Sequence, residues 1–303
     1  VDLPLALLFQ KPTIEHLAAH IRRQSGTAWQ QFSPLVEIQR GPSGPAFFCV
    51  HPSGGNVLCY ADLAKHLGAD QTFYGLQAQG LDGAQVALTS IEQMAESYVE
   101  AIRAIQAIGP YFLGGWSMGG LVAFEMAQQL QAQGQQVSLL ALIDTNVPTL
   151  EAQLAKPDEI SLMLSFARDM GLAWEQLQVS ANDLVGLDSR QQLAYVLELA
   201  MKANVLSRDV DQAQVERLYN VFKTNVRAML DYAPKPLAAQ ITLFKAEEAL
   251  VSGDSQAGWQ HFALEGVEVL AVPGNHYTMV REPNVEILAR YLARCMAKEL
   301  ISA

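Results

Sequence analysis

A glycine-rich hexapeptide at residues 115–120, Gly-Trp-Ser-Met-Gly-Gly, constrains the fold more than any other feature of this chain. The apolar run Tyr111–Leu113 before it predicts a strand, and the apolar segment after it predicts a helix. A serine on so tight a strand-to-helix turn needs neighbours without side chains, which Gly115 and Gly119 provide. Ser117 would then lie at a helix N-terminus, where free N–H groups and the helix dipole favour developing negative charge. The sequence therefore predicts a nucleophilic serine on a strained turn.

Strand and helix patterns alternate along most of the chain. Helix patterns separate the strands, and one of them opens on a capping box that runs from Ser90 to Gln93. Strands joined by helices form a largely parallel sheet with helices on both faces. The predicted fold class is therefore α/β. Besides the run before the hexapeptide, apolar runs of strand length occur at 35–38, 46–50, 72–76, 138–143, 240–245 and 267–272.

The alternation stops between residues 148 and 232, where only helix patterns are found. Asp158 and Asp188 are placed to cap two helices, and a longer one begins near Gln212 with apolar residues at helical spacing. A structureless loop of this length would be unusual in a compact domain. We expect an all-helical insertion that covers the functional site as a lid. The alternative is a helical bundle with no part in function.

Composition excludes several classes of function. Half of the residues are hydrophobic and 17% are charged, so a sizeable core is expected. The formal net charge is −11 and no cluster of lysine and arginine stands out, which argues against a nucleic-acid surface. No apolar run reaches the roughly 18 residues of a membrane span. Cys49, Cys59 and Cys295 lack metal-ligand spacing and indicate free thiols in a reducing cytoplasm. We expect no metal site and no cofactor bound by this domain.

A nucleophilic serine needs a general base, and the base needs an orienting acid. His276 follows Ser117 in the sequence and lies just past the last predicted strand. The other histidines lie before the hexapeptide or, for His261, in a loop ahead of that strand. The order serine, acid, histidine is that of α/β-hydrolases, which is the fold we expect.

Two places in the chain could supply the acid. Asp144 ends the strand after the hexapeptide's helix, whereas Glu247 and Glu248 lie beyond the following strand, where many α/β-hydrolases keep the acid. An unpaired carboxylate at the edge of a buried strand is costly, and a hydrogen bond from His276 would offset that cost. Glu247 and Glu248 lie in a polar stretch that solvent can reach. This comparison favours Asp144.

An acyl-transfer site also needs an oxyanion hole made of two backbone N–H groups. Met118, the residue after the serine, would supply one of them. The second should come from the loop after an early strand, where glycines allow the backbone to approach a carbonyl closely. We expect Gly54 to supply it, with Ser53 as the alternative.

Together these pieces resemble the thioesterase domains that end nonribosomal peptide synthetases and polyketide synthases. The resemblance runs from about residue 35 to the C-terminus. It implies that a carrier protein presents an acyl or peptidyl chain as a phosphopantetheine thioester, that Ser117 takes the chain, and that hydrolysis or macrocyclisation releases it. Family members carry the acid after the strand that follows the serine, which supports Asp144. Besides the hexapeptide, the matching motifs are His51-Pro52-Ser53-Gly54-Gly55, Tyr74-Gly75-Leu76-Gln77, Gly80-Leu81-Asp82-Gly83, Leu142-Ile143-Asp144 and Gly274-Asn275-His276.

Residues 1–24 are similar to the tail of a carrier protein, through Leu7-Leu8-Phe9-Gln10-Lys11-Pro12-Thr13-Ile14. Residues 25–34 are expected to form a linker, and residues 35–303 the thioesterase domain. The chain lacks an initiator methionine, so we expect it to be part of a longer one. The expected partner is the upstream carrier domain of the same polypeptide, with no nucleic acid and no membrane. The sequence does not decide between a monomer and a homodimer.

Three other functions compete with this one. An editing thioesterase that clears misprimed carriers would not explain the long insertion and the carrier-like tail. A general serine ester hydrolase would not need that tail. A catalytically silent binding protein would not need Ser117, Asp144 and His276 together.

Overall fold

The computed structural model describes residues 33–42, 44–171, 181–202, 212–250, 256 and 258–302. The predicted carrier-protein tail at 1–24 lies outside these ranges, as does the predicted linker except for Ser33 and Pro34. The domain boundaries proposed for this part of the chain therefore stay predictions.

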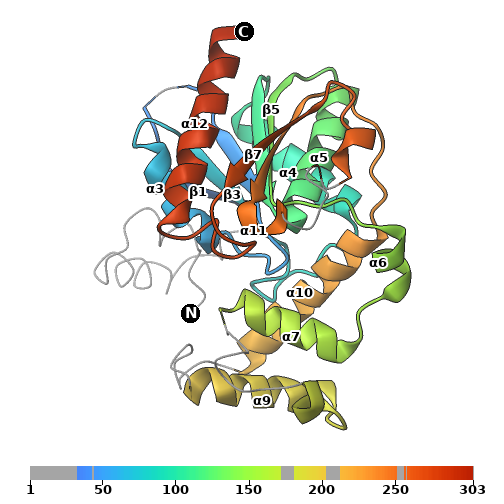
Figure 1. Ribbon diagram of the computed structural model, residues 1–303. Coiled ribbons are helices and arrows are strands. Elements are labelled where there is room, and N and C mark those ends of the chain that lie inside the picture. Colours follow the sequence, from blue (N-terminus) through green and yellow to red (C-terminus); the bar gives the residue numbers. More distant parts are fainter. Residues whose placement is uncertain are drawn as a thin grey trace.

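The described strands form one sheet of seven strands in the order β1-β3-β2-β4-β5-β6-β7. β1 runs antiparallel to β3, and every other neighbouring pair is parallel. The interior strands β2, β4 and β6 are buried along their whole length, as expected of a sheet covered on both faces. The predicted α/β-hydrolase arrangement is confirmed (Figure 1). The strands are β1 (Leu35–Gln39), β2 (Phe47–Val50), β3 (Phe73–Leu76), β4 (Tyr111–Trp116), β5 (Val137–Ile143), β6 (Ile241–Ala246) and β7 (Val267–Val272).

Helices cover both faces of the sheet. Successive side chains of a strand point to opposite faces, so the apolar strands present hydrophobic side chains on each face that must be buried. Phe48 and Val50 of β2 belong to the core beneath α4 and α5. Phe47 and Cys49 belong to the core beneath α3 and α12. The predicted cap of α4 is present, since the Ser90 hydroxyl accepts a hydrogen bond from the Gln93 amide at 3.2 Å. The helices are α3 (Ala61–Leu67), α4 (Ile91–Ile105), α5 (Met118–Ala132) and α12 (Asn284–Ser302), with the short elements η1 (Leu58–Tyr60), α11 (Glu247–Leu250) and η3 (Trp259–His261).

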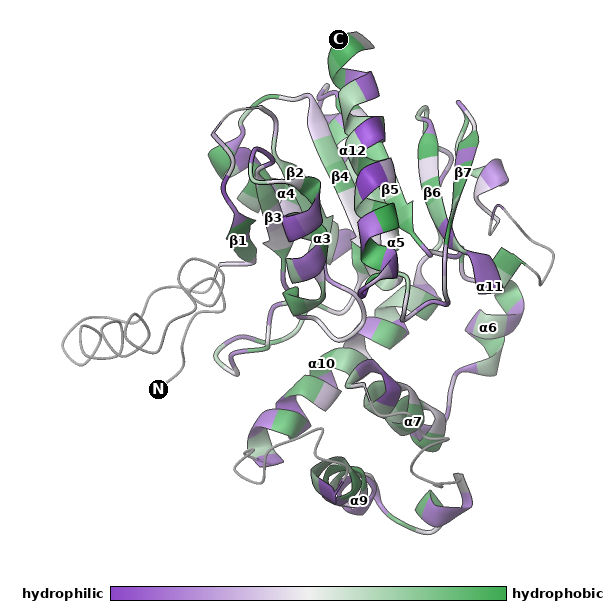
Figure 2. Cartoon of the chain, turned by 60° about the vertical axis from the view of Figure 1, so that its left-hand side comes forward, coloured by the Kyte–Doolittle hydropathy of each residue, from purple (hydrophilic) through white to green (hydrophobic). Residues whose placement is uncertain are grey.

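The helical insertion, residues 148–232, holds no strand among its described residues, as predicted. The expected caps are present: the carboxylates of Asp158 and Asp188 accept hydrogen bonds from the amides of Ser161 and Gln191 at 2.7 and 2.9 Å. The insertion has a hydrophobic core of its own. Figures 1 and 2 show α7, α9 and α10 grouped beyond one end of the sheet. Its elements are α6 (Leu150–Ala155), α7 (Glu159–Asp169), η2 (Ala181–Leu184), α9 (Ser189–Lys202) and α10 (Gln212–Asp231).

Candidate active site

Ser117 lies on the tight turn between β4 and α5. Its backbone φ is 58°, a value that residues other than glycine rarely adopt. The turn closes only because glycines flank it. A Cβ on Gly115 would lie 2.2 Å from the Gly119 backbone, and one on Gly119 would lie 2.3 Å from the carbonyl oxygen of Val50. The Thr145 hydroxyl donates to the carbonyl of Ser117 at 2.9 Å. The predicted close approach of strand and helix is thus present, and it presents the serine at the N-terminus of α5.

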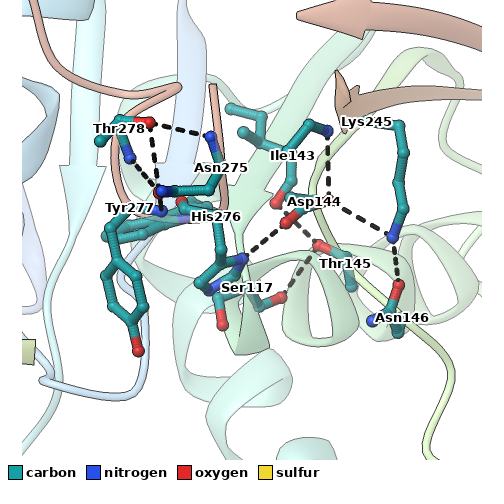
Figure 3. A network of polar contacts seen from close by, with 12 residues as sticks. Ser117, Ile143, Asp144, Thr145, Asn146, Lys245, Asn275, His276, Tyr277 and Thr278 are labelled. Atoms are coloured by element: carbon teal, nitrogen blue, oxygen red, sulfur yellow. Dashed lines mark hydrogen bonds and ion pairs between the residues drawn. The ribbon is translucent and has the colours of Figure 1, made fainter. Parts of the chain in front are cut away.

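Asp144 directly follows β5 and contacts His276, which lies in the turn after β7. Nδ1 of His276 lies 2.7 Å from Oδ2 of Asp144, and Figure 3 shows Ser117 beside the same imidazole. The other carboxylate oxygen, Oδ1, lies 3.3 Å from Nζ of Lys245 and accepts from the Ala246 amide at 3.3 Å. The structure therefore brings together the three side chains that the sequence singled out. Glu247 and Glu248 are exposed on α11 instead.

Only 6% of Asp144 is exposed, so its charge needs compensation. Burial alone would raise the pKa of its carboxyl group. The hydrogen bond with His276, the charges of His276 and Lys245, and the Ala246 amide outweigh that effect, and the pKa is lowered. Asp144 is therefore a carboxylate at neutral pH, able to accept the Nδ1–H of the imidazole.

The turn after β7 fixes the position of His276. The side-chain oxygen of Asn275 accepts hydrogen bonds from the amides of Tyr277 and Thr278, both at 3.1 Å. The indole of Trp116 donates to the carbonyl of His276 at 3.1 Å, and the two rings lie 5.2 Å apart between centroids. The imidazole is thus held from its own turn and from the strand that carries the serine.

The two predicted oxyanion amides come from different elements: Gly54 lies in the loop after β2, and Met118 is the first residue of α5. Within the described residues, the amides of Gly54 and Met118 donate to no partner. The buried ring of His51 links the loop after β2 to α4, because it contacts the Pro52 carbonyl at 2.7 Å and the Tyr98 hydroxyl at 2.8 Å. Burial lowers the pKa of His51 to about 4, so its ring is neutral and suited to a structural role.

A cavity of about 180 Å³ lies at this site. Its walls come partly from the sheet loops, through Ser53, Ser117 and His276, and partly from the helical insertion. The insertion contributes apolar side chains from α7 and α10 and one acid, Asp169. The insertion therefore lies directly against the residues that the sequence proposed for chemistry. The apolar contributors include Leu162, Phe222, Val226 and Met229.

Two charged groups at the site were missed by sequence reasoning. Lys245 ends an apolar run that pairs with the strand of Asp144, and a buried cation there should have indicated a carboxylate partner. Asp169, at the end of α7, gave no such signal. A Cβ on Gly54 would lie 2.2 Å from its Oδ2 atom, so this carboxyl group lies against the loop of the predicted oxyanion hole. Burial raises the pKa of Asp169 to about 6, against the opposing charges of His276 and Arg281.

Replacing Asp169 by asparagine is expected to stabilise the protein at pH values above about 6. The folded state binds the Asp169 proton more tightly than the unfolded chain does. The contribution of Asp169 to stability is therefore fully present below the ordinary aspartate pKa of 3.8, and it is lost as pH rises through about 6. D169N removes this loss, worth about 2–3 kcal/mol at about pH 8 and close to zero near pH 4. Urea unfolding across this range measures it. D231N, at an exposed aspartate of α10, should show no such trend, and a pH-independent gain in D169N would contradict the argument.

Comparison with known proteins agrees with this geometry. The family model described as "Thioesterase domain" matches residues 45–295. The chain is 31% identical over 256 residues to a dimodular nonribosomal peptide synthase of Bacillus subtilis (strain 168), covering 81% of this chain and 10% of that protein. It is 32% identical over 298 residues to a chondramide synthase of Chondromyces crocatus, covering 95% of this chain and 8% of that one. The chain thus spans a small part of these curated relatives.

Solved structures give the same result. The four-domain nonribosomal peptide synthetase holo-AB3403, bound to AMP and glycine, superimposes with a TM-score of 0.80 and 31% identity, over 97% of this chain and 22% of that one. The Vlm2 thioesterase domain bound with a dodecadepsipeptide gives a TM-score of 0.65 and 25% identity, over 86% of this chain and 97% of that one. With a family model that covers most of its length and a matching fold, this chain belongs to the thioesterase domain family of α/β-hydrolase enzymes.

Proposed function

We propose that this chain takes an acyl or peptidyl chain from the phosphopantetheine thioester of a carrier protein and releases it by hydrolysis or macrocyclisation. The observation that carries the proposal is that Ser117 and His276 line one cavity, while the Asp144 carboxylate contacts Nδ1 of His276 at 2.7 Å. The proposed catalytic residues are these three, with the amides of Gly54 and Met118 as oxyanion donors. The phosphopantetheine belongs to the carrier and arrives with the substrate.

In the first half-reaction, Nε2 of His276 takes the proton from the Ser117 hydroxyl as its oxygen attacks the thioester carbon. The carbonyl oxygen becomes an anion at the N-terminus of α5, where the amides of Met118 and Gly54 stabilise it. The carbon–sulfur bond then breaks, and the phosphopantetheine thiol leaves with the proton that His276 had taken. Asp144 holds Nδ1–H and stabilises the transient imidazolium. The chain is left as an ester on Ser117.

In the second half-reaction, water or a hydroxyl or amine of the bound substrate attacks the ester carbon, with His276 again accepting the proton. The bond between this carbon and the Ser117 oxygen then breaks, and His276 returns the proton to the serine oxygen. Attack by the substrate's own end, which gives a macrocycle, requires that water be kept out of the site and that the acyl or peptidyl chain fold back on itself. The apolar side chains of α7 and α10 support this role, and we assign the insertion as a lid. The cavity of about 180 Å³ is smaller than the roughly 300–1,000 Å³ of most small-molecule sites, so part of the lid would move to admit a chain.

The proposal includes the organisation of the chain. Residues 1–24 would be the end of a carrier domain and residues 25–34 its linker to the thioesterase domain at 35–303. A cytoplasmic location is proposed on separate grounds: Cys49, Cys59 and Cys295 are all free, as expected of a reducing compartment. Among the described residues, none of the helices combines the length and apolar character that a membrane span requires.

The proposal predicts a preference for the carrier-bound substrate. We expect the same octanoyl chain to be released from a holo carrier protein with kcat/KM at least about 10-fold above that for its N-acetylcysteamine thioester, because the carrier surface adds binding energy. Intact-protein mass spectrometry should also show a transient octanoyl adduct on the enzyme.

The matching oxygen ester, p-nitrophenyl octanoate, separates this function from that of a general ester hydrolase. A general hydrolase would turn over that ester and show no gain from the carrier. Release only of short misprimed groups, with longer chains left on the carrier, would favour an editing thioesterase.

A further inference from the structure

Helix α10 is fixed to the body of the domain at its C-terminal end. The hydroxyl of Tyr232, which follows the helix, donates to the carboxylate of Glu125 on α5 at 2.8 Å. The side chain of Gln153 donates to the carbonyl of Tyr232 at 3.2 Å. The bond to Glu125 holds α10 against the helix that begins at the serine, and the bond from Gln153 holds it to α6 of the insertion, so the part of α10 at the cavity can act as a fixed support.

Asn225, on this part of α10, contacts the loop after β2. Its Nδ2 group donates to the carbonyl oxygen of Ser53 at 2.9 Å, across 172 positions of sequence. Only 1% of Asn225 is exposed, and the same stretch of helix carries the apolar residues Phe222 and Val226. Burying an amide costs about 1–3 kcal/mol unless it is hydrogen-bonded, so an apolar residue would serve packing better here. The hydrogen bond to Ser53 is the feature that asparagine adds.

The carbonyl of Ser53 and the N–H of Gly54 belong to the same peptide unit. The unit is planar and trans, so its C=O and N–H point in opposite directions. A hydrogen bond that fixes the Ser53 carbonyl therefore also fixes the direction of the Gly54 N–H. Gly54 has no Cβ to restrict rotation of this unit, so the restraint has to come from outside the loop.

The neighbouring peptide units are restrained by other groups. The carbonyl of Pro52, which shares a unit with the Ser53 amide, contacts the Gly55 amide at 2.9 Å and the His51 ring at 2.7 Å. The carbonyl of Gly55 accepts from the Ala78 amide at 2.8 Å. Among the described contacts, Asn225 alone acts on the unit that carries the Gly54 N–H.

We propose that Asn225 is a positioning residue that aims the Gly54 amide at the oxyanion, so that the insertion helix α10 completes the oxyanion hole. The inference rests on the proposed function and deepens it, because it selects Gly54 over Ser53 as the second donor. The Ser53 amide belongs to the unit held by Gly55 and His51, so loss of Asn225 would leave it in place.

The test compares Asn225→Ala and the nearly isosteric Asn225→Asp, whose carboxylate cannot donate, with Asn220→Ala, a matched change at an exposed site of the same helix. Loss of one oxyanion donor costs about 100–1,000-fold in kcat, so a misaimed donor should cost about 10–100-fold. The octanoyl N-acetylcysteamine thioester reports kcat and KM. An octyl trifluoromethyl ketone, which forms an anionic tetrahedral adduct with the serine, reports the oxyanion hole without turnover.

We expect both Asn225 variants to lose kcat with KM little changed, and to bind the ketone more weakly by a similar factor, while N220A matches wild type. A folded variant of Asn225 with wild-type kcat and ketone affinity would overturn the inference, as would a loss of kcat with unchanged ketone affinity. N225D carries the test if N225A does not fold. If the wild type itself neither binds the ketone nor turns over the thioester, the proposed function fails and this inference falls with it.

Discussion

Replacing Ser117 by alanine is expected to lower kcat by roughly 10⁴–10⁶-fold and to abolish the acyl adduct. The reason is that the reaction proceeds through an ester on the oxygen of Ser117, the residue that caps α5 and lies beside His276. The fold should be unaffected. The Ser117 side chain makes no hydrogen bond within the described residues, and alanine meets the same strain at a φ of 58°. Turnover of the carrier-bound thioester and intact-protein mass measure the two effects.

Ser165 provides a matched control for S117A. It lines the same cavity from α7, and its alanine variant removes the same atom without touching the proposed nucleophile. S165A should therefore form the adduct and keep kcat within about threefold of wild type. Retention of more than about one per cent of activity by S117A, or an adduct on it, would assign the nucleophile to another residue.

The strand ends that carry the site could be predicted because local patterns encode them. A glycine pair around Ser117, an apolar run ending in Asp144 and a turn after the last strand at His276 each mark the end of a parallel strand. Such ends meet at one edge of the sheet. The alternation of strands and helices likewise predicted the sheet and the place of the insertion. These features depend on neighbours within a few residues, which a sequence displays directly.

The side chains that contact the site from distant parts of the sequence could not be predicted in the same way. Lys245 contacts Asp144, Asp169 lies against Gly54, and Asn225 donates to Ser53 from 172 positions away. Each depends on how the insertion or a neighbouring strand packs against the site. In the sequence, Asp169 and Asn225 are polar residues of helices like many others. Their roles arise only when tertiary packing removes them from water.

Replacing Asp144 by asparagine is expected to lower kcat by about 10³–10⁴-fold. The carboxylate accepts Nδ1–H of His276 at 2.7 Å, which leaves Nε2 free to take the serine proton. An asparagine can place its NH₂ group there, which favours the wrong tautomer and no longer stabilises the imidazolium. Substrate binding does not use Asp144, so KM should change little. Steady-state kinetics with the octanoyl thioester separates the two parameters.

The same substitution should also destabilise the fold by about 3 kcal/mol at neutral pH, because it leaves the buried ammonium of Lys245 without its carboxylate. The pKa of Asp144 is lowered in the folded state, so its contribution is present above the unfolded pKa and is lost as pH falls through the folded value. The stability difference between wild type and D144N should therefore narrow in acid, as urea unfolding would show.

Lys245→Met separates the catalytic effect from the structural one. It removes the cation that lies 3.3 Å from Asp144 but leaves the contact between Asp144 and His276 in place. K245M should also lose stability, because the buried Asp144 carboxylate loses its lysine and keeps only His276 and the Ala246 amide as partners, yet it should keep kcat within about 10-fold of wild type. Equal losses of kcat in both variants would mean that the ion pair, rather than the orientation of the imidazole, sets the rate. If D144N kept wild-type activity, another residue would have to be the acid that orients His276.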